Sequence, residues 1–166
     1  MDMNIRTATI EDLNLLTAVE KECFPPNEAA TEELFRERLK YFADHFWLLF
    51  DGDRLVSFVD GFATDERDLT DIMYEDASMH DEYGSWQMIF GVNTIPEYRN
   101  KGCAGRLIRH VISEADKQAR DGVVLTCKKE LVPYYSRFGF VSEGVTLKSL
   151  HGGVTWYQMR LTFKAV

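Results

Sequence analysis

The sequence predicts a single α/β domain in which helices flank a mixed central sheet. Apolar, β-rich runs alternate with helically spaced apolar residues along all 166 residues. No internal repeat, linker or change of composition divides the chain, and its length is typical of one domain. Hydrophobic residues at 45% and aromatic residues at 13% are enough to form a sizeable core.

Composition also narrows the class of function. The net charge of −8 argues against nucleic acid as the main partner and is compatible with a cationic substrate. Cys23, Cys103 and Cys127 lack Cys-x-x-Cys spacing, so we expect neither a disulfide framework nor a metal site. The polar first residues and the lack of an apolar run of about 18 residues predict a cytoplasmic protein with no membrane partner.

The first part of the chain predicts one strand and two helices. Residues 4–8 alternate as in a short strand, and Thr9 with Asp12 three positions later has the pattern of a capping box at a helix start. A second helix is predicted to begin near Thr31. The proline-containing segment 24–30 between the helices is either a simple turn or a mobile wall over a substrate pocket.

The next segment predicts a hairpin and an acidic insertion. Residues 45–50 and 54–62 form two apolar runs joined by Asp51-Gly52-Asp53, a strong hairpin signal. Residues 65–84 are rich in carboxylates and contain one short apolar group that predicts a brief helix. The carboxylates either form a solvated face or create a negative field that attracts an amine.

Residues 86–119 are predicted to form a strand (86–94), a basic turn containing glycines, and an amphipathic helix. The apolar stripe of this helix consists of Leu107, Ile108, Val111, Ile112, Ala115 and Ala119.

The last part of the chain predicts three strands and one short helix. Residues 123–127 are a continuous apolar run, which favours a buried strand. A short helix is predicted to begin near Pro133 and to end at Gly139. Two final strands are predicted at 145–150 and 155–163, with a turn at 151–153.

The turn before the long helix has the properties of a pyrophosphate site. The first N–H groups of a helix lack intrahelical acceptors, and the helix dipole favours negative charge there. Gly102 and Gly105 allow close approach, while Arg99, Lys101 and Arg106 supply positive charge. Neither a Walker loop nor a dinucleotide fingerprint is present. The alternative is an ordinary connection in which the glycines serve close packing.

The pattern Arg-x-x-Gly-x-Ala at residues 99–104, between a strand and a helix, resembles the acetyl-CoA loop of the GNAT N-acetyltransferase superfamily. The resemblance implies a GNAT-like single domain over residues 1–166, with acetyl-CoA bound at residues 86–119 as co-substrate. The cofactor-binding residues that it implies are Val92, Asn93, Thr94, Arg99, Asn100, Lys101, Gly102, Cys103, Ala104 and Gly105.

A second motif strengthens the resemblance. Tyr135 to Phe140 matches the GNAT pattern Tyr-x-x-x-Gly-Phe, which implies that the Tyr135 hydroxyl protonates the leaving CoA thiolate. Residues 131–138 are also similar to serotonin (arylalkylamine) N-acetyltransferases. Those enzymes carry two histidines on the central strand, where this chain has Met88 and Phe90, so the histidine relay does not carry over.

The acceptor side can be argued from chemistry. An alkyl ammonium with a pKa of about 10 must lose a proton before it attacks a thioester. The resulting oxyanion is best held by a backbone N–H, which the resemblance places in residues 92–94. Asp60, Glu28, carboxylates of residues 65–84 and a water chain remain alternative bases. The candidate substrate contacts are Phe24, Pro25, Glu28, Asp60, Met88 and Phe90.

We therefore expect direct acetyl transfer from acetyl-CoA to the primary amine of a small molecule, an arylalkylamine or another amine, by a monomer or homodimer. Acetylation of a protein or peptide is one alternative, and a non-catalytic acyl-CoA sensor is the other.

Overall fold

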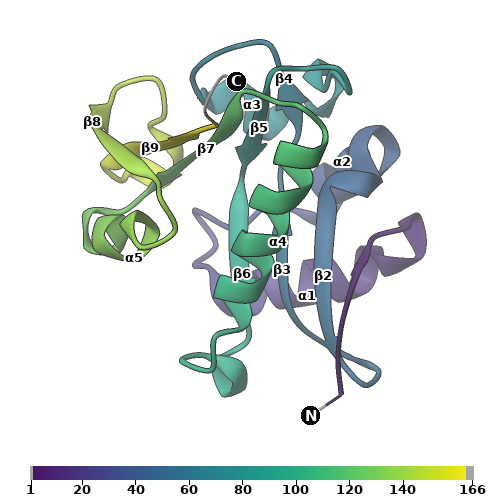
Figure 1. Ribbon diagram of the computed structural model, residues 1–166. Coiled ribbons are helices and arrows are strands. Elements are labelled where there is room, and N and C mark those ends of the chain that lie inside the picture. Colours follow the sequence, from purple (N-terminus) through teal and green to yellow (C-terminus); the bar gives the residue numbers. More distant parts are fainter. Residues whose placement is uncertain (1, 164–166) are drawn as a thin grey trace. The chain divides into compact units, whose positions relative to one another are not determined.

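The computed structural model describes residues 2–163, in which helices and strands alternate as predicted (Figure 1). The described chain forms two compact units, residues 2–61 with 91–110 and residues 62–90 with 111–163. No helix within 2–163 combines the length and apolar character needed to cross a membrane.

The first unit contains an antiparallel sheet with the strand order β1-β2-β3-β6. Its strands are β1 (Met3–Thr7), β2 (Phe46–Asp51), β3 (Arg54–Asp60) and β6 (Gly91–Thr94). The predicted hairpin joins β2 to β3, and Gly52 at its tip has a φ of 59°, which glycine adopts without a steric penalty.

Two helices pack in this unit, and their starts were predicted correctly. A 3-10 turn (Ile10–Asp12) with a complete Thr9–Asp12 capping box leads into α1 (Leu13–Cys23). The Thr31 hydroxyl accepts a hydrogen bond from Leu34 N at 3.2 Å and caps α2 (Glu32–Phe42). Helix α1 packs on β3, β6 and α2.

Aromatic rings link α2 to the sheet. The Phe35 ring lies edge-on to Phe46 and Phe58, with centroids 6.0 and 5.9 Å apart. All three side chains are fully buried. Edge-to-face pairs add to the free energy of burial, so this cluster fixes α2 against β2 and β3.

The second unit contains a sheet with the order β4-β5-β7-β9-β8, in which β5 and β7 are parallel. Its strands are β4 (Ala63–Thr64), β5 (Trp86–Ile89), β7 (Gly122–Cys127), β8 (Val141–Thr146) and β9 (Trp156–Thr162). The unit also contains α3 (Asp71–Glu75) and α5 (Val132–Ser136). Helix α4 (Cys103–Lys117) continues from the first unit into the second.

The prediction of one continuous strand over residues 86–94 was wrong, whereas the predicted fold class of mixed strands flanked by helices is confirmed. The chain forms β5 and β6 with Phe90 between them, and the two strands belong to different sheets. β5 pairs with β4 and β7, whereas β6 pairs with β3. Because partner choice depends on distant segments, the apolar run alone did not reveal the break.

Two further predictions need correction. Ala119 does not extend the apolar stripe, because α4 ends at Lys117 and Ala119 is exposed with a φ of 60°. The strand predicted at 145–150 is β8, which begins at Val141 and ends at Thr146. β8 is an exposed edge strand with a register shift between Ser142 and Val145, so its sequence lacks a clear apolar alternation.

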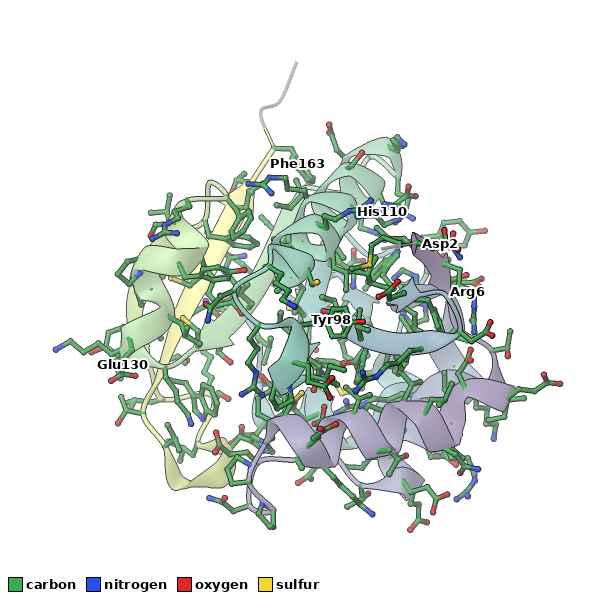
Figure 2. All side chains as sticks on the ribbon, turned by 90° about the horizontal axis from the view of Figure 1, so that it is seen from below. Asp2, Arg6, Tyr98, His110, Glu130 and Phe163 are labelled. Atoms are coloured by element: carbon green, nitrogen blue, oxygen red, sulfur yellow. The ribbon has the colours of Figure 1, made fainter. Side chains whose placement is uncertain are left out.

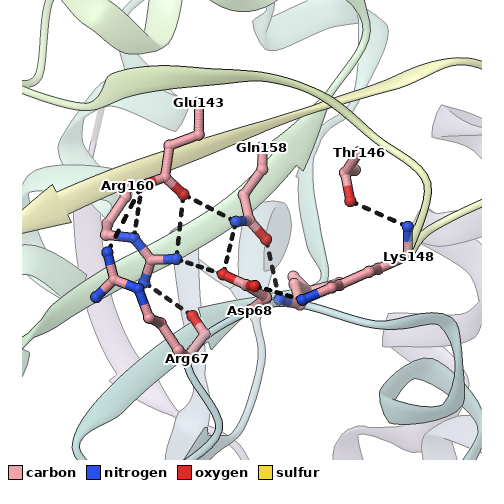
Figure 3. A network of polar contacts seen from close by, with 8 residues as sticks. Arg67, Asp68, Glu143, Thr146, Lys148, Gln158 and Arg160 are labelled. Carbon is pink, nitrogen blue, oxygen red and sulfur yellow. Dashed lines mark hydrogen bonds and ion pairs between the residues drawn. The ribbon is translucent and has the colours of Figure 1, made fainter.

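The acidic stretch 65–84 is neither a purely solvated face nor a free negative field. Asp68 accepts hydrogen bonds from Arg160 at 2.7 Å, Gln158 at 3.0 Å and Lys148 at 2.7 Å (Figure 3). Asp71 accepts from the Leu150 N–H at 2.7 Å. These carboxylates connect residues 65–84 to β9 and to residues 148–150, which precede β9 in the chain.

Candidate functional site

The predicted phosphate loop lies between β6 and α4 in the first unit. A 3-10 turn (Pro96–Tyr98) leads into it, and Asn100 and Gly102 have φ values of 63° and 79°. The left-handed conformation at Gly102 turns the chain directly into α4, whose first residue is Cys103.

The start of α4 is open to a ligand. A Cβ on Gly102 would meet no atom within 4 Å, so a phosphate can approach the backbone closely. Arg106 N donates to Gly102 O at 3.0 Å, and the helix N–H groups before Arg106 have no acceptor within the helix. The exposed side chains of Lys101 and Arg106 add positive charge at the positive end of the helix dipole. Cys103 and Gly105 are buried, whereas Ala104 is half-buried.

Side-chain contacts hold the turn before the loop. Tyr98, labelled in Figure 2, donates its hydroxyl to Asp51 Oδ2 at 2.6 Å. The Arg54 guanidinium forms two hydrogen bonds with Glu97, at 2.7 and 3.0 Å. Arg99 Nε donates to Thr94 O at 3.0 Å. Arg99 therefore braces the loop against β6, which is a more specific role than the general positive charge that we predicted.

β6 presents backbone groups away from β3. Ile95 N donates to Val56 O at 3.0 Å, and the register pairs Asn93 with Phe58. Hydrogen bonding alternates along an antiparallel pair, so Gly91, Asn93 and Ile95 bond to β3 while Val92 and Thr94 face the other way. Within the described residues, β6 pairs with β3 alone, and the Val92 N–H is directed away from that partner.

A cluster of buried polar side chains lies on the α1 face of the same strand. Glu20 of α1, Asp60 of β3 and Asn93 of β6 are 5%, 1% and 0% exposed. Arg38 of α2 pairs with Asp60, with Nη1 3.0 Å from Oδ2. Asp60, one of the candidate bases, is therefore a buried, ion-paired carboxylate at the end of β3.

Burial changes the acidity of both carboxyl groups. Desolvation, assisted by the nearby Asp60 charge, raises the pKa of Glu20 to about 7. Desolvation also raises the pKa of Asp60, to about 6, although Arg38 opposes the shift. Glu20 thus titrates close to neutral pH, the range in which a carboxylate is an efficient proton acceptor.

The segment 24–30 is an ordered turn in this unit. Glu28 N and Ala29 N both donate to Pro25 O at 2.9 Å. Ala30 N donates to Glu20 Oε2 at 2.8 Å, so the turn is joined to the buried cluster. Glu28 is 8% exposed, whereas Phe24 is half-buried and Pro25 is exposed.

The second unit contains the remaining predicted residues. Tyr135 in α5 is 6% exposed and lies edge-on to Tyr134 and Phe140, at centroid distances of 5.2 and 6.1 Å. Desolvation raises the pKa of Tyr135 above its usual value, with smaller contributions from Cys127 and Tyr134. Tyr135 therefore keeps its proton near neutral pH and is available as a donor.

Comparison with known proteins identifies the family. Residues 11–163 match the family described as "Acetyltransferase (GNAT) domain". The chain belongs to the GNAT acetyltransferase family. Members of this family are acyltransferases that depend on acyl-CoA, so this GNAT protein is an enzyme of that class. No curated protein sequence matches the chain.

Solved structures agree with the GNAT fold. The loading GNATL domain of CurA from Lyngbya majuscula has a TM-score of 0.83 and 18% identity, covering 96% of this chain and 97% of that one. The ribosomal-protein-S18-alanine N-acetyltransferase from Escherichia coli has a TM-score of 0.72 and 15% identity, with coverages of 99% and 96%. The PaiA N-acetyltransferase from Thermoplasma acidophilum, in complex with coenzyme A, has a TM-score of 0.73 and 15% identity, with coverages of 98% and 100%.

The residues predicted for the GNAT site divide between the units. The first unit holds every predicted cofactor-binding residue and four candidate substrate contacts, which are Phe24, Pro25, Glu28 and Asp60. The second unit holds Tyr135, Met88 and Phe90. Met88 is fully buried, whereas the half-buried Phe90 ring contacts Phe62 and Tyr74 at centroid distances of 4.9 and 5.0 Å.

Glu20 is the residue that sequence reasoning missed. It follows Leu16 by four positions and Val19 by one, so it lies on the buried stripe of α1. A glutamate on an apolar helix stripe is rare and requires a polar partner in the fold. The position of Glu20 on the apolar stripe of α1 was therefore the feature of the sequence that could have indicated a buried polar site.

Proposed function

We propose that this GNAT protein transfers the acetyl group of acetyl-CoA to the primary amine of a small molecule, in a ternary complex and as a single domain over residues 1–166. The observation that carries the proposal is the open start of α4 at Gly102, next in the chain to the exposed backbone of β6. The loop binds the pyrophosphate of CoA, and the outward Val92 N–H stabilises the oxyanion.

The reaction balances with residues of this chain. The ammonium first loses a proton, and the free amine nitrogen then attacks the thioester carbonyl. The C–N bond forms, the C–S bond breaks, and the departing thiolate takes a proton from Tyr135. The nitrogen loses its second proton as the amide forms, which balances the proton supplied by Tyr135.

The buried carboxylates of the first unit favour a cationic acceptor. In the second unit, the half-buried Phe90, Tyr74 and His151 rings contact one another in sequence, with Tyr74 and His151 stacked at 5.1 Å, and aromatic rings of this kind are typical partners of aryl groups. The similarity of residues 131–138 to arylalkylamine N-acetyltransferases supports the same choice. We therefore propose an arylalkylamine as the first acceptor to test.

The test is thiol release from acetyl-CoA with tryptamine, phenethylamine, spermidine, lysine and a short peptide between about pH 6 and 9, which spans the titration of Glu20. Turnover of arylethylamines is expected. Turnover of the peptide alone would instead indicate protein acetylation, and CoA binding with no turnover would indicate a sensor.

Two variants test the assigned roles. Tyr135→Phe is expected to lower kcat by about 100-fold while CoA affinity is retained, because a general acid is lost. Gly102→Glu is expected to bind CoA at least about tenfold more weakly than Gly102→Ala, because only glutamate adds negative charge at the helix start. The alanine variant is the matched control, since both substitutions share the strain of a φ of 79°. Equal CoA affinity of the two variants would refute the loop assignment.

A further inference from the structure

The buried cluster on the α1 face of β6 contains polar atoms without partners. Glu20 Oε1, Asp60 Oδ1 and both amide atoms of Asn93 form no hydrogen bond of 3.5 Å or shorter among the described residues, although the Asn93 side chain is close enough to Glu20 to lower the pKa of that carboxyl group. Buried polar atoms in native proteins are nearly always paired, so such a set requires a physical explanation. All three side chains are more than nine-tenths buried.

The unpartnered atoms converge on one point beside Gly91. A Cβ on Gly91 would lie 3.3 Å from Asp60 Oδ1, 3.3 Å from Asn93 Nδ2 and 3.9 Å from Glu20 Oε1. Gly91 and Asn93 are two residues apart on β6 and therefore share a face, and Gly91 pairs with Asp60 in the register. Any other residue at position 91 would fill this space.

The other oxygen of each carboxylate is already bound. Glu20 Oε2 accepts from Ala30 N at 2.8 Å, and Asp60 Oδ2 accepts from Arg38 Nη1 at 3.0 Å. These bonds fix both side chains and direct Glu20 Oε1 and Asp60 Oδ1 towards the space beside Gly91. The site is therefore preorganised by α1, α2 and β3.

The charges favour a cation. With both carboxylates ionised, the cluster contains two negative charges and the single positive charge of Arg38. A primary ammonium carries one positive charge and three N–H donors, and the two acceptors that face this space, Glu20 Oε1 and Asp60 Oδ1, can each take one of them. A neutral or anionic ligand would leave the excess charge buried, which is costly.

We propose that the Glu20–Asp60–Asn93 cluster beside Gly91 binds the ammonium group of the acceptor amine and that Glu20 takes its proton. The role of Glu20 as a base rests on the proposed acetyl transfer. The ability of the cluster to bind a cation does not depend on that proposal. The N–H bond of the ammonium breaks, its proton passes to Glu20 Oε1, and the nitrogen keeps the electron pair that attacks the thioester. Glu20 then returns the proton to solvent.

The titration of Glu20 sets the pH at which this transfer occurs. The groups that act on Glu20 come from each element around it: Asp60 of β3, Arg38 of α2, Asn93 of β6 and the Ala30 N–H. Asp60 raises its pKa, and the other three lower it. Only ionised Glu20 accepts a proton, so kcat/KM should rise with pH and level off above about 7.

The first experiment needs no substrate. The carboxyl carbons of glutamate are labelled with ¹³C, and their titration is followed by NMR with n-propylammonium chloride or with NaCl at equal ionic strength. One glutamate is expected to titrate near 7, to be absent in Glu20→Gln, and to shift to a lower pH with n-propylammonium but not with NaCl. A titration that is the same in both salts would overturn the cation site.

The second experiment measures kinetics with the best amine of the panel. Glu20→Gln is expected to lower kcat by about 100-fold or more, and the rise of kcat/KM near pH 7 should disappear while CoA affinity is retained. Glu22→Gln is the matched control, because Glu22 is exposed on the same helix, and it should keep both the rate and the pH profile. An unchanged pH profile in Glu20→Gln would overturn the role as base.

The two experiments separate the two proposals. A cation-dependent shift of Glu20 without turnover of any amine would leave the cation site standing and refute acetyl transfer to these amines. Turnover without a cation-dependent shift would support acetyl transfer and refute the cation site.

Discussion

Removal of Arg160 is expected to destabilise the second unit substantially. Arg160 is 4% exposed, and its guanidinium donates to Glu143 at 3.0 and 3.1 Å, to Asp68 at 2.7 Å and to the Arg67 carbonyl at 2.8 Å (Figure 3). It also lies 4.6 Å from the centre of the Trp86 ring. Arg160→Met keeps the approximate length of the side chain and removes the charge and every one of these donors.

The expected loss in the free energy of unfolding depends on the two carboxylates, Asp68 and Glu143, that Arg160→Met leaves without the guanidinium. Removing one partner of a fully buried ion pair costs about 3–5 kcal/mol. The Asp68 and Glu143 side chains are 29% and 33% exposed, so water partly replaces the lost guanidinium. We therefore expect Arg160→Met to lower the free energy of unfolding by about 2–3 kcal/mol at pH 7.

Arg67→Met is the control. The Arg67 side chain is 64% exposed, yet it lies 4.0 Å from the same Glu143 carboxylate and 5.6 Å from the same Trp86 ring. Its loss should cost less than about 1 kcal/mol. Urea denaturation of the wild type and the two variants measures the difference. If Arg160→Met cost no more than Arg67→Met, the network would not stabilise this unit.

The pH dependence provides a second check. The hydrogen bond from Arg160, ahead of other contributions, lowers the pKa of Glu143. A lowered carboxyl pKa stabilises the fold above the unfolded pKa of about 4.3, and this stabilisation is lost as the pH falls through the folded pKa. The difference between wild type and Arg160→Met should therefore be complete at pH 7 and should shrink below about pH 4.

Two further predictions concern single positions in the second unit. Gly122→Ala should lower the free energy of unfolding, measured by urea denaturation, by about 3 kcal/mol or more, because its Cβ would lie 2.0 Å from the Leu161 carbonyl oxygen. Gly144→Ala, whose Cβ would meet no atom within 4 Å, should lower it by only about 1 kcal/mol through backbone strain. Similar losses in the two variants would refute the steric argument. Burial raises the pKa of Cys127 to about 11, so little of its thiol is ionised at pH 8. Because iodoacetamide reacts with the thiolate, it should alkylate Cys127 about 200-fold more slowly in the folded protein than in urea. Equal rates would contradict the burial of Cys127.

Elements with local signals could be predicted from the sequence. Thr9, Thr31 and the Asp51-Gly52 turn each act within a few residues of the chain, and each is where we expected it. The division of residues 86–94 into two strands and the position of β8 depend on which distant strands pair. No local pattern encodes those partners, which is why these predictions failed.

The same distinction applies to the site. The loop around Gly102 is a local arrangement of turn, glycine and helix start, so its spacing was informative. The cluster of Glu20, Asp60 and Asn93 comes from a helix and two strands that are distant in the sequence. Glu20 gave a local sign of burial, but its partners depend on the register of β3 with β6.

The buried cluster destabilises the fold at the pH where we propose that it works. The pKa of Glu20 is about 7 in the folded protein, above its ordinary value of 4.5. A raised carboxyl pKa means that stability is complete below the unfolded pKa and is lost as the pH rises through the folded pKa. For Glu20 this loss amounts to about 3 kcal/mol once it is ionised, and Asp60 acts in the same direction. An ammonium bound beside Gly91 pairs with that charge and recovers part of the loss. Part of the free energy that the fold loses by holding an ionised Glu20 is therefore recovered when the acceptor binds, so the affinity for the amine depends on the pKa of Glu20.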